Sequence, residues 1–361
     1  MREYIYNLAT DDKKGFIASL IKILLFLLAL IYTLVVRILI FIYGIKPRYL
    51  ACKVISVGNI TLGGTGKTSL VGFIARYLKQ EGHNVAILSR GYKRKVHRIT
   101  TDYGLRVTGY GMMGDEPYML KNSLKSIPVL VDTNRIRCAN LGIRDYGADT
   151  VILDDGLQQW KIKKDLEIVT IDAANPFGNR KLLPRGILRQ PISTLNKVDV
   201  FILTKTDLNP DIGWIKDFLR QLNPGAEIFE SVHKVVGLYK LGESEKLLAA
   251  DMLKGKTVTV FSGIGDPAYF ENTVRNLKAN IGLTFRFPDH YPYSQKDLIS
   301  IIEESRRENI EAIVTTEKDA VRLTAQALTS SLAAIFVLRI ELKITKDEEG
   351  FYSRLHKLYS L

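Results

Sequence analysis

Cysteine is scarce in this chain of 361 residues. The two cysteines, Cys52 and Cys138, are isolated and lie outside any spacing typical of metal ligands. The sequence therefore excludes a disulfide-built scaffold and indicates a reducing compartment. Proline is also scarce, at 11 residues, while 46% of the residues are hydrophobic, and together these exclude a disordered chain. The length predicts two domains, or one large domain with an appendage.

Acidic residues are absent from one long stretch, since none lies between Lys13 and Gln80. The formal net charge of the chain is +13, and a second basic cluster follows at residues 93–98. Such a surface favours an anionic partner. We expect no nucleic acid, because the sequence has no zinc-ligand spacing and no basic stretch interleaved with aromatic residues. An anionic membrane surface or a phosphorylated lipid fits the charge better.

The longest apolar run covers residues 16–45 and could cross a bilayer, which needs about 20 apolar residues. Lys22 and Arg37 leave only 14 uninterrupted residues between them, or about 21 Å of helix, which is shorter than a hydrocarbon core of about 30 Å. Basic residues flank both ends, so the positive-inside rule gives no simple orientation. We predict a helix that lies in or dips into one leaflet. A true span, a secretory signal and a buried core helix are the alternatives.

Residues 54–68, VISVGNITLGGTGKT, predict a nucleoside triphosphate site. They are typical of a buried strand that enters a glycine-rich turn, although the strict pattern has glycine where this chain has Thr61. Backbone N–H groups of such a turn surround phosphate oxygens, Lys67 can reach the β- and γ-phosphates, and the Thr68 hydroxyl can bind Mg²⁺. The alternative is a structural strand-to-helix turn. The predicted nucleotide-binding residues are Gly63, Gly64, Thr65, Gly66, Lys67, Thr68 and Ser69.

The alternation of strands and helices after residue 50 predicts an α/β fold that is P-loop NTPase-like, with a mostly parallel sheet flanked by helices. Expected strands are residues 53–57, 85–89, 129–131, 150–153, 167–171, 198–203, 256–261, 313–315 and 334–338, with an extended segment at 232–241. Expected domains are a membrane-associated helix (1–48), a P-loop kinase domain (49–231), a linker (232–249), a smaller α/β domain (250–345) and a C-terminal helix (346–361).

Carboxylates at the end of an expected strand provide a candidate metal site. Asp154 and Asp155 follow the apolar residues 151–153, where a P-loop enzyme places its Mg²⁺-directed aspartate. An ordinary Asp-Gly turn is the alternative.

Two further acidic sites lie in expected loops. Asp115 and Glu116 stand between Gly114 and Pro117, where a solvated turn is favoured from the sequence alone. Asp289 precedes His290 among prolines and aromatic residues. His290 is a candidate proton carrier, although a lone loop histidine is more often merely exposed.

Taken in order, the motifs resemble the tetraacyldisaccharide 4′-kinase family, the lipid A 4′-kinases. They are GN…GGTGKT (58–68), SRGY (89–92), GDEP (114–117), DDGLQ (154–158), LPRG with LR (183–189), SGIGDP (262–267), DH (289–290) and TEKDAV (316–321). The departures from the family pattern, Ser69, Leu157 and Asp266, affect no presumed catalytic atom.

This resemblance implies transfer of the γ-phosphoryl group of ATP, with Mg²⁺, to the 4′-hydroxyl of a tetraacylated glucosamine disaccharide 1-phosphate. The reaction would take place at the cytoplasmic face of the inner membrane, in lipopolysaccharide biosynthesis. Asp115 would be the base, and His290 would hold or tune it. We expect the two domains to close on the substrates, because His290 and the P-loop come from different predicted domains. The remaining implied roles are Mg²⁺ binding by Asp154 and Asp155 and support from Glu116, Asp289, Arg90 and Gln158.

A membrane-associated P-loop GTPase or transport ATPase is the alternative function. Residues 204–207, TKTD, are similar to the guanine-reading Asn-Lys-x-Asp motif without its asparagine. That loss favours a site that is not specific for guanine. A purely structural membrane-anchored module would leave Lys67 and the carboxylate sites unexplained.

Overall fold

The chain folds into two compact units in a computed structural model, which describes residues 7–91, 113–209, 211–323 and 334–360. Unit 1 comprises Met1–Arg90, Asn134–Val232 and Lys343–Leu361. Unit 2 comprises Gly91–Thr133 and His233–Leu342. The basic cluster at 93–98 and Tyr92 of the SRGY motif lie outside the described residues.

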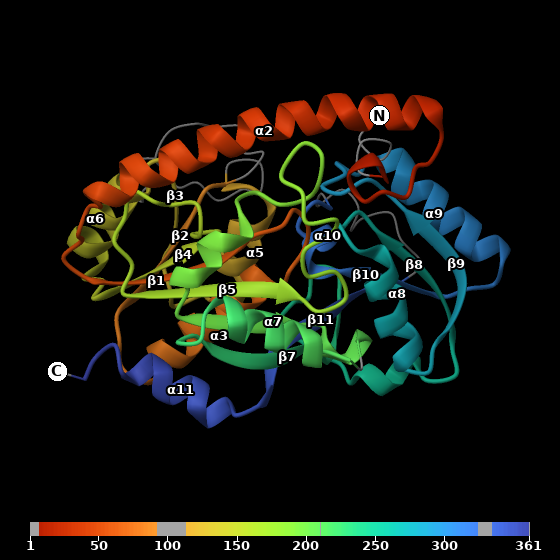
Figure 1. Ribbon diagram of the computed structural model, residues 1–361. Coiled ribbons are helices and arrows are strands. Elements are labelled where there is room, and N and C mark those ends of the chain that lie inside the picture. Colours follow the sequence, from red (N-terminus) through yellow and green to blue (C-terminus); the bar gives the residue numbers. More distant parts are fainter. Residues whose placement is uncertain (1–6, 92–112, 210, 324–333, 361) are drawn as a thin grey trace. The chain divides into compact units, whose positions relative to one another are not determined.

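Unit 1 is built on parallel strands in the order β2-β4-β1-β5-β6, followed by the first part of β7 (Figure 1). The strands are β1 (Lys53–Asn59), β2 (Val85–Ser89), β4 (Thr150–Asp154), β5 (Leu166–Asp172), β6 (Val200–Thr204) and β7 (Glu227–Lys240). The side chains of β2, β4 and β6 are all buried and those of β1 and β5 nearly all, as expected where helices and loops cover both faces of a parallel sheet. The carboxyl ends of these strands share one edge, and β1 pairs with β4 so that Val57 lies opposite Asp154.

Helices of unit 1 pack on this sheet. Helix α3 (Lys67–Gln80) lies against β1, β2 and β4 and buries Leu70, Val71, Ile74 and Leu78. Helix α6 (Arg135–Tyr146) contacts β2, and α7 (Gly213–Leu222) contacts the short helix η1 (Ile192–Lys197); η2 (Thr206–Leu208) follows β6. Helix α11 (Glu348–His356) packs on α3 through stacked rings of Tyr77 and Tyr352, 4.1 Å between centroids.

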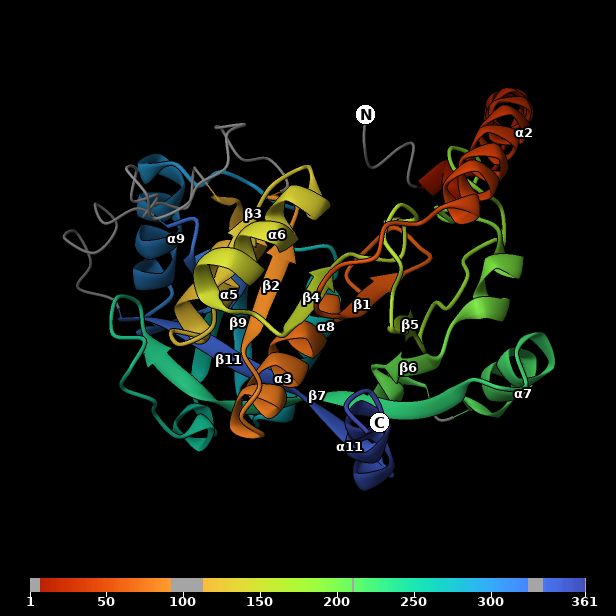
Figure 2. The ribbon, with the colours of Figure 1, turned by 90° about the vertical axis from the view of Figure 1, so that its left-hand side faces the viewer.

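Helix α2 (Phe16–Ile45) lies at the outer edge of unit 1 in both views (Figures 1 and 2). Ala18, Ala29 and Val36 are its buried residues, and their spacing defines one stripe that faces the protein. The rest of the surface exposes large apolar side chains, including Phe16, Leu20, Leu24, Leu27, Ile31, Leu34, Phe41 and Ile45. By length and composition, α2 is long enough to cross a membrane.

Unit 2 has its own parallel strands in the order β11-β10-β8-β9. They are β8 (Thr257–Ser262), β9 (Asn280–Arg286), β10 (Ala312–Thr316) and β11 (Ala334–Lys346). The other elements are α5 (Asp115–Ser123), β3 (Val129–Val131), η3 (Ala250–Leu253), α8 (Pro267–Asn276), α9 (Gln295–Arg307) and α10 (Glu317–Ala320). The core is formed by Leu238, Val258, Val260, Phe270, Val314 and Phe336, with a second cluster around Phe261, Ile302 and Ile313.

The predicted fold class, a mostly parallel sheet flanked by helices, is confirmed. Strand β9 was missed, because Gly282 near its centre and Asn280 at its start both disfavour a strand. The extended segment expected at 232–241 forms the second part of β7, which continues as a strand to Lys240.

The compact units also differ from the predicted domain ranges. Gly91–Thr133 belongs to unit 2 rather than to the domain that carries the P-loop, and the predicted N- and C-terminal ranges both belong to unit 1. The physical reason is packing: α5 lies against α10 and β3, where Met113 and Val131 form a small buried cluster with Tyr118 and Val129. Asp115, the first residue of α5, is therefore in the same unit as His290.

Candidate active site

The glycine-rich turn connects β1 to α3 at the carboxyl edge of the unit 1 sheet. Gly66 has φ 77°, a left-handed conformation that suits glycine, and it lets α3 begin at Lys67. No acidic residue lies in the first turn of α3, so the N–H groups of Lys67, Thr68 and Ser69 start a helix whose positive end favours an anion. A Cβ added at Gly63 or Gly64 would meet no described atom within 4 Å. Open space therefore lies beside these two glycines, as a phosphate-binding turn requires.

Thr65 anchors the turn to the sheet beneath it. Its Oγ1 lies 2.8 Å from Oγ1 of Thr170 on β5, and Thr204 on β6 donates to its backbone carbonyl at 3.3 Å. Thr65 is buried, so its side chain fixes the turn and leaves only its backbone N–H for a ligand.

Asp155 lies between two cations beside this turn. Arg189 holds its carboxylate with both terminal nitrogens, at 2.7 and 2.9 Å, and Lys67 Nζ is 3.9 Å from Oδ1. Arg189 also donates to Asn59 Oδ1 at 3.0 Å. Burial would raise the pKa of Asp155, but the Arg189 and Lys67 charges lower it below its ordinary value. Asp155 therefore stays ionised at neutral pH.

Asp154 and its neighbours border the same edge of the sheet. Ser89 donates to Asp154 Oδ2 at 3.1 Å, and Gln158 Nε2 donates to the backbone carbonyl of Asn59 at 3.2 Å. Arg90 follows β2 and is exposed.

These side chains suit a nucleotide-bound magnesium ion. The Asp154 carboxylate and the Thr68 hydroxyl offer hard oxygen atoms, while both Asp155 oxygens already accept from Arg189. Mg²⁺ typically takes one or two carboxylates together with substrate phosphates. Among the described residues, no cluster of three or more His, Cys, Asp or Glu side chains could hold a metal by itself. These oxygen atoms therefore fit a metal ion that is also bound by the phosphate oxygens of a nucleotide.

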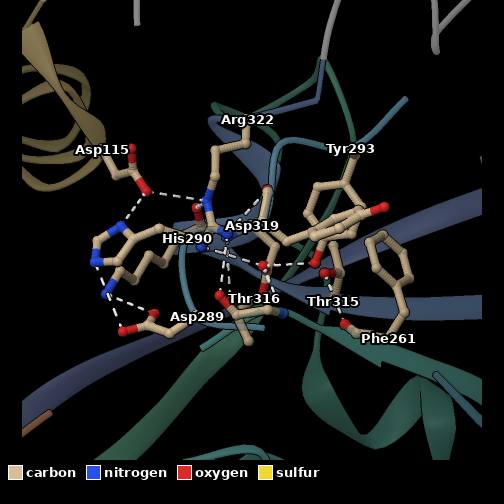
Figure 3. Close-up of polar contacts among 12 residues, drawn as sticks. Asp115, Phe261, Asp289, His290, Tyr293, Thr315, Thr316, Asp319 and Arg322 are labelled. Carbon is tan, nitrogen blue, oxygen red and sulfur yellow. Dashed lines mark hydrogen bonds and ion pairs between the residues drawn. The ribbon is translucent and has the colours of Figure 1, made fainter. Parts of the chain in front are cut away.

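In unit 2, the Asp115 carboxylate is buried against His290 and Arg322 (Figure 3). His290 Nδ1 lies 2.7 Å from Asp115 Oδ2, and Arg322 Nε lies 3.1 Å from the same oxygen. The backbone N–H of His290 donates to the carbonyl of Gly263 at 3.1 Å, and His290 has φ 61°. The histidine loop is thus fastened to the end of β8.

Arg322 is shared between Asp115 and a second buried carboxylate, Asp319 (Figure 3). Arg322 Nη2 lies 3.2 Å from Asp319 Oδ1, and Nη1 donates to the Gly263 carbonyl at 3.0 Å. Asp319 accepts from the Gly263 N–H at 2.9 Å, from the Tyr293 hydroxyl at 2.8 Å and from Thr316 Oγ1 at 2.5 Å. Both charged side chains are fully buried, so each requires the other.

Electrostatics separates the two carboxylates. Burial would raise the pKa of Asp115, but the hydrogen bond from His290 and the charge of Arg322 lower it below its ordinary value. Burial raises the pKa of Asp319, against the opposing effect of Arg322. Asp115 is therefore the stronger acid of the pair.

The structure brings all four predicted residues of unit 2 together. Lys318 Nζ lies 3.4 Å from Glu116 and 3.5 Å from Asp289, and His290 Nε2 is 3.7 Å from Asp289. Burial alone would lower the pKa of Lys318, but Glu116 and Asp289 raise it above its ordinary value. The charged Lys318 side chain thus links Glu116, which follows Asp115, to Asp289, which precedes His290.

The arginines were missed from the sequence. Arg189 lies in the LR motif and Arg322 directly follows TEKDAV, so both were adjacent to recognised patterns without a role. Lys318 and Asp319 lie inside that second pattern. Their positions in motifs, and the three-residue spacing of Asp319 and Arg322, were the available signals. The other carboxylate partners, Asp155 of Arg189, Asp115 of Arg322, and Glu116 and Asp289 of Lys318, are tens to hundreds of residues away.

A glycine-rich turn with Lys67 and Thr68 at the carboxyl edge of a parallel sheet defines a P-loop nucleotide-binding protein. The family model for tetraacyldisaccharide-1-P 4′-kinase (LpxK) matches residues 21–360, and the chain belongs to this family. It is accordingly an enzyme of the kinase class.

Relatives agree with this placement. The chain is 33% identical over 364 residues to the tetraacyldisaccharide 4′-kinase of Halothermothrix orenii, covering 95% of this chain and 94% of the relative. It is 37% identical over 313 residues to that of Syntrophus aciditrophicus, covering 84% and 83%. The crystal structure of LpxK from Aquifex aeolicus in complex with ATP has a TM-score of 0.74 at 28% identity, covering 92% of this chain and 98% of that one. The predicted resemblance is confirmed.

Replacing Arg322 by methionine (Arg322→Met) should cost about 3–5 kcal/mol of unfolding free energy, because Asp115 and Asp319 lose their shared buried cation. The folded-state pKa of each carboxyl then rises. A raised folded-state pKa adds stability at low pH that is lost as the pH increases. The loss of unfolding free energy in Arg322→Met relative to the wild type should therefore be smaller at pH 5 than at pH 8. Urea denaturation at both pH values measures it.

Arg339→Met is the matched control, since Arg339 pairs with Glu317 at 2.9 Å in a partly exposed position. It should cost about 1 kcal/mol or less. Equal losses in the two variants, or a deficit in Arg322→Met that grows on acidification, would contradict the assignment.

Proposed function

We propose that this tetraacyldisaccharide 4′-kinase transfers the γ-phosphoryl group of ATP to the 4′-hydroxyl of a tetraacylated glucosamine disaccharide 1-phosphate, a lipid A precursor. Family membership supports the activity, and the ATP in the Aquifex aeolicus structure supports the donor. The observation that carries the residue roles is the buried Asp115–His290 contact of 2.7 Å. Membership of this family favours a kinase over the GTPase and transport ATPase alternatives.

In this proposal, unit 1 binds and neutralises the triphosphate. The N–H groups of the turn and of the start of α3 receive the phosphates, and Lys67 supplies a point charge to the transferring group. Mg²⁺, when bound, offsets the phosphate charge, with Thr68 and Asp154 as its protein oxygens. Asp155 contributes through the water shell and by holding Lys67 and Arg189, because both of its oxygens already accept from Arg189.

Unit 2 supplies the base. An ionised carboxylate only accepts hydrogen bonds, so His290 Nδ1 carries the proton of the 2.7 Å contact. Both His290 and Arg322 contact Oδ2, which leaves Oδ1 as the oxygen that takes the acceptor hydroxyl proton. A carboxylate of low pKa is a weak base, so His290 has the role of orienting Asp115 and stabilising its charge until the transition state forms.

We further propose that α2 lies in one leaflet of an anionic membrane, at the cytoplasmic face of the inner membrane. Two of its aromatic rings meet basic groups of unit 1: Lys181 Nζ lies 5.8 Å from the Phe26 ring centroid, in the first half of the helix, and Lys161 Nζ lies 4.5 Å from the Tyr43 ring centroid, near its end. A helix of 30 residues is about 45 Å long. A span perpendicular to the bilayer would draw these lysines into hydrocarbon, whereas a helix parallel to the surface keeps them in the headgroup region.

The charge of α2 supports the same orientation. Lys22, which interrupts the apolar run, pairs with Asp11 at 2.7 Å and is mostly shielded from solvent. The lipid-facing surface is therefore more continuous than the sequence suggests. Exposed Arg37, Lys46 and Arg48 lie on or just beyond the helix and suit anionic headgroups. A substrate with four acyl chains remains in the bilayer, so an enzyme bound there meets it directly.

Lys67→Ala should lower phosphoryl transfer by at least about 100-fold, because it removes a charge from the transferring group. The measurement is thin-layer detection of labelled phosphate moved from ATP to the tetraacyldisaccharide 1-phosphate. Lys79→Ala, at the exposed far end of α3, is the control and should transfer normally. Near wild-type transfer by a folded Lys67→Ala protein would disprove the P-loop role.

Asp115→Asn and His290→Ala should each lower turnover by about 10²–10⁴-fold while ATP affinity changes little. The double variant should lose scarcely more than the worse single variant, because the two side chains act as one unit. Removing His290 also removes a contact that keeps the pKa of Asp115 low, so the acid limb of the rate profile should move to higher pH. A multiplicative loss, or an unmoved acid limb, would show that the residues act separately.

Leu24→Glu combined with Ile31→Glu should weaken binding to vesicles containing anionic phospholipid by at least about 100-fold, since two exposed apolar side chains no longer enter the bilayer. Sedimentation with vesicles measures this. Leu208→Glu, which changes an exposed leucine of η2, is the control. Unchanged sedimentation of the double variant would remove α2 from membrane binding.

A further inference from the structure

Residues 187–189 pair with the chain that enters the P-loop. The N–H of Arg189 donates to the carbonyl of Ile60 at 2.8 Å, and the N–H of Leu62 donates to that of Ile187 at 2.8 Å. Thr61 and Leu188 form an antiparallel bridge between these two bonds. Any displacement of this short segment therefore acts on the residues immediately before the glycine-rich turn.

Helix α2 holds the same stretch of chain at two points. The Tyr32 hydroxyl, on the protein-facing stripe, donates to the backbone carbonyl of Arg189 at 2.8 Å, across 157 residues of sequence. Nearer the start of the helix, Asp11 pairs with Lys22 of α2 and with Arg185, each at 2.7 Å. In both views the loop that carries these residues lies beside α2 (Figures 1 and 2).

Arg189 thus connects two functions in one residue. Its backbone carbonyl receives Tyr32, and its guanidinium holds Asp155 and Asn59 next to Lys67. A hydrogen bond to the backbone fixes the position from which a side chain extends, and a two-nitrogen contact to a carboxylate depends strongly on that position. An undocked α2 in a lipid surface would leave the Tyr32 hydroxyl and Lys22 without their protein partners, whereas water would hydrogen-bond both, so a lipid surface favours the docked position.

We propose that Tyr32 is a positioning residue for the nucleotide site, and that binding of α2 to an anionic lipid surface raises the affinity for Mg²⁺-ATP through the Tyr32–Arg189 hydrogen bond. This inference rests on the proposed function, because it requires Asp155 and Lys67 to act on the nucleotide. Coupling between two ligands is reciprocal, so Mg²⁺-ATP must raise the affinity for the lipid surface by the same factor.

The test uses the full chain and measures binding of a non-hydrolysable ATP analogue with Mg²⁺, with and without phosphatidylglycerol vesicles that contain no acceptor. The wild type should bind the analogue about 5-fold tighter with vesicles, and vesicles should bind about 5-fold tighter with the analogue. Tyr32→Phe should lose both increases, although it sediments with vesicles alone as the wild type does.

Tyr43→Phe is the matched control on the same helix. Tyr43 contacts Lys161 through its ring face, which phenylalanine retains, so this variant should keep both increases. In an Arg189→Lys background, which loses the two-nitrogen contact, Tyr32→Phe should have no further effect. A purely structural role for Tyr32 would instead lower the melting temperature and leave the vesicle-dependent increase in place.

The outcomes separate this inference from the proposed function. If the wild type binds the analogue but vesicles do not change its affinity, or if Tyr32→Phe keeps the increase, the coupling through Tyr32 is wrong and the kinase assignment stands. If the wild type binds no analogue under any condition, the nucleotide site itself is wrong and the inference falls with it.

Discussion

A carboxylate that is removed from water needs a cation, and this requirement organises both candidate sites. Ionising an isolated buried carboxyl group costs several kcal/mol, so such a group either takes up a proton or is paired. Asp155 is paired with Arg189 and Lys67, and Asp115 with Arg322 and His290. In both cases the pKa is lower than usual, although Asp115 is fully buried and Asp155 is partly buried. In the proposed function, the charges used in phosphoryl transfer are therefore maintained by contacts within each unit.

The pairing also explains why each arginine is held by its backbone or by neighbouring carbonyls. A guanidinium can bind a carboxylate with defined geometry only if the backbone or the guanidinium itself is held in a fixed position by other contacts. Arg189 gains that place from its hydrogen bonds to Ile60 and Tyr32, and Arg322 from carbonyl acceptors, including Gly263, beside the end of β8. The two arginines thus bring order to loops that leave the carboxyl ends of parallel strands, where main-chain support from a sheet stops.

Local patterns in the sequence were sufficient for much of the fold and for the nucleotide turn. The P-loop is one contiguous stretch, and β-branched runs predicted the main strands. The Asp115–His290 contact joins residues 175 apart and was predicted only through the family resemblance. The partners of Arg189, the contact of Arg322 with Asp115, and the packing of Gly91–Thr133 into unit 2 depend on tertiary structure that no local pattern encodes. Lys22 illustrates the limit, because it appeared to interrupt an apolar surface but pairs with Asp11 on the protein side.

Helix α2 shows how few polar groups can orient an almost wholly apolar element. Apolar burial is not directional, so a helix that is hydrophobic on every side could rotate about its axis with little change in buried area. Lys22 and Tyr32 remove that freedom, because each binds a polar partner on the protein side of the helix. Lys22 pairs with Asp11, and the Tyr32 hydroxyl donates to the Arg189 carbonyl. Rotation would expose both groups to hydrocarbon without partners, at a cost of roughly 1–3 kcal/mol for each neutral hydrogen bond and more for the charge. The polar contacts therefore determine which face of α2 points outward, where the proposed membrane surface would meet it, and one of them, from Tyr32, is made to the residue that also holds Asp155.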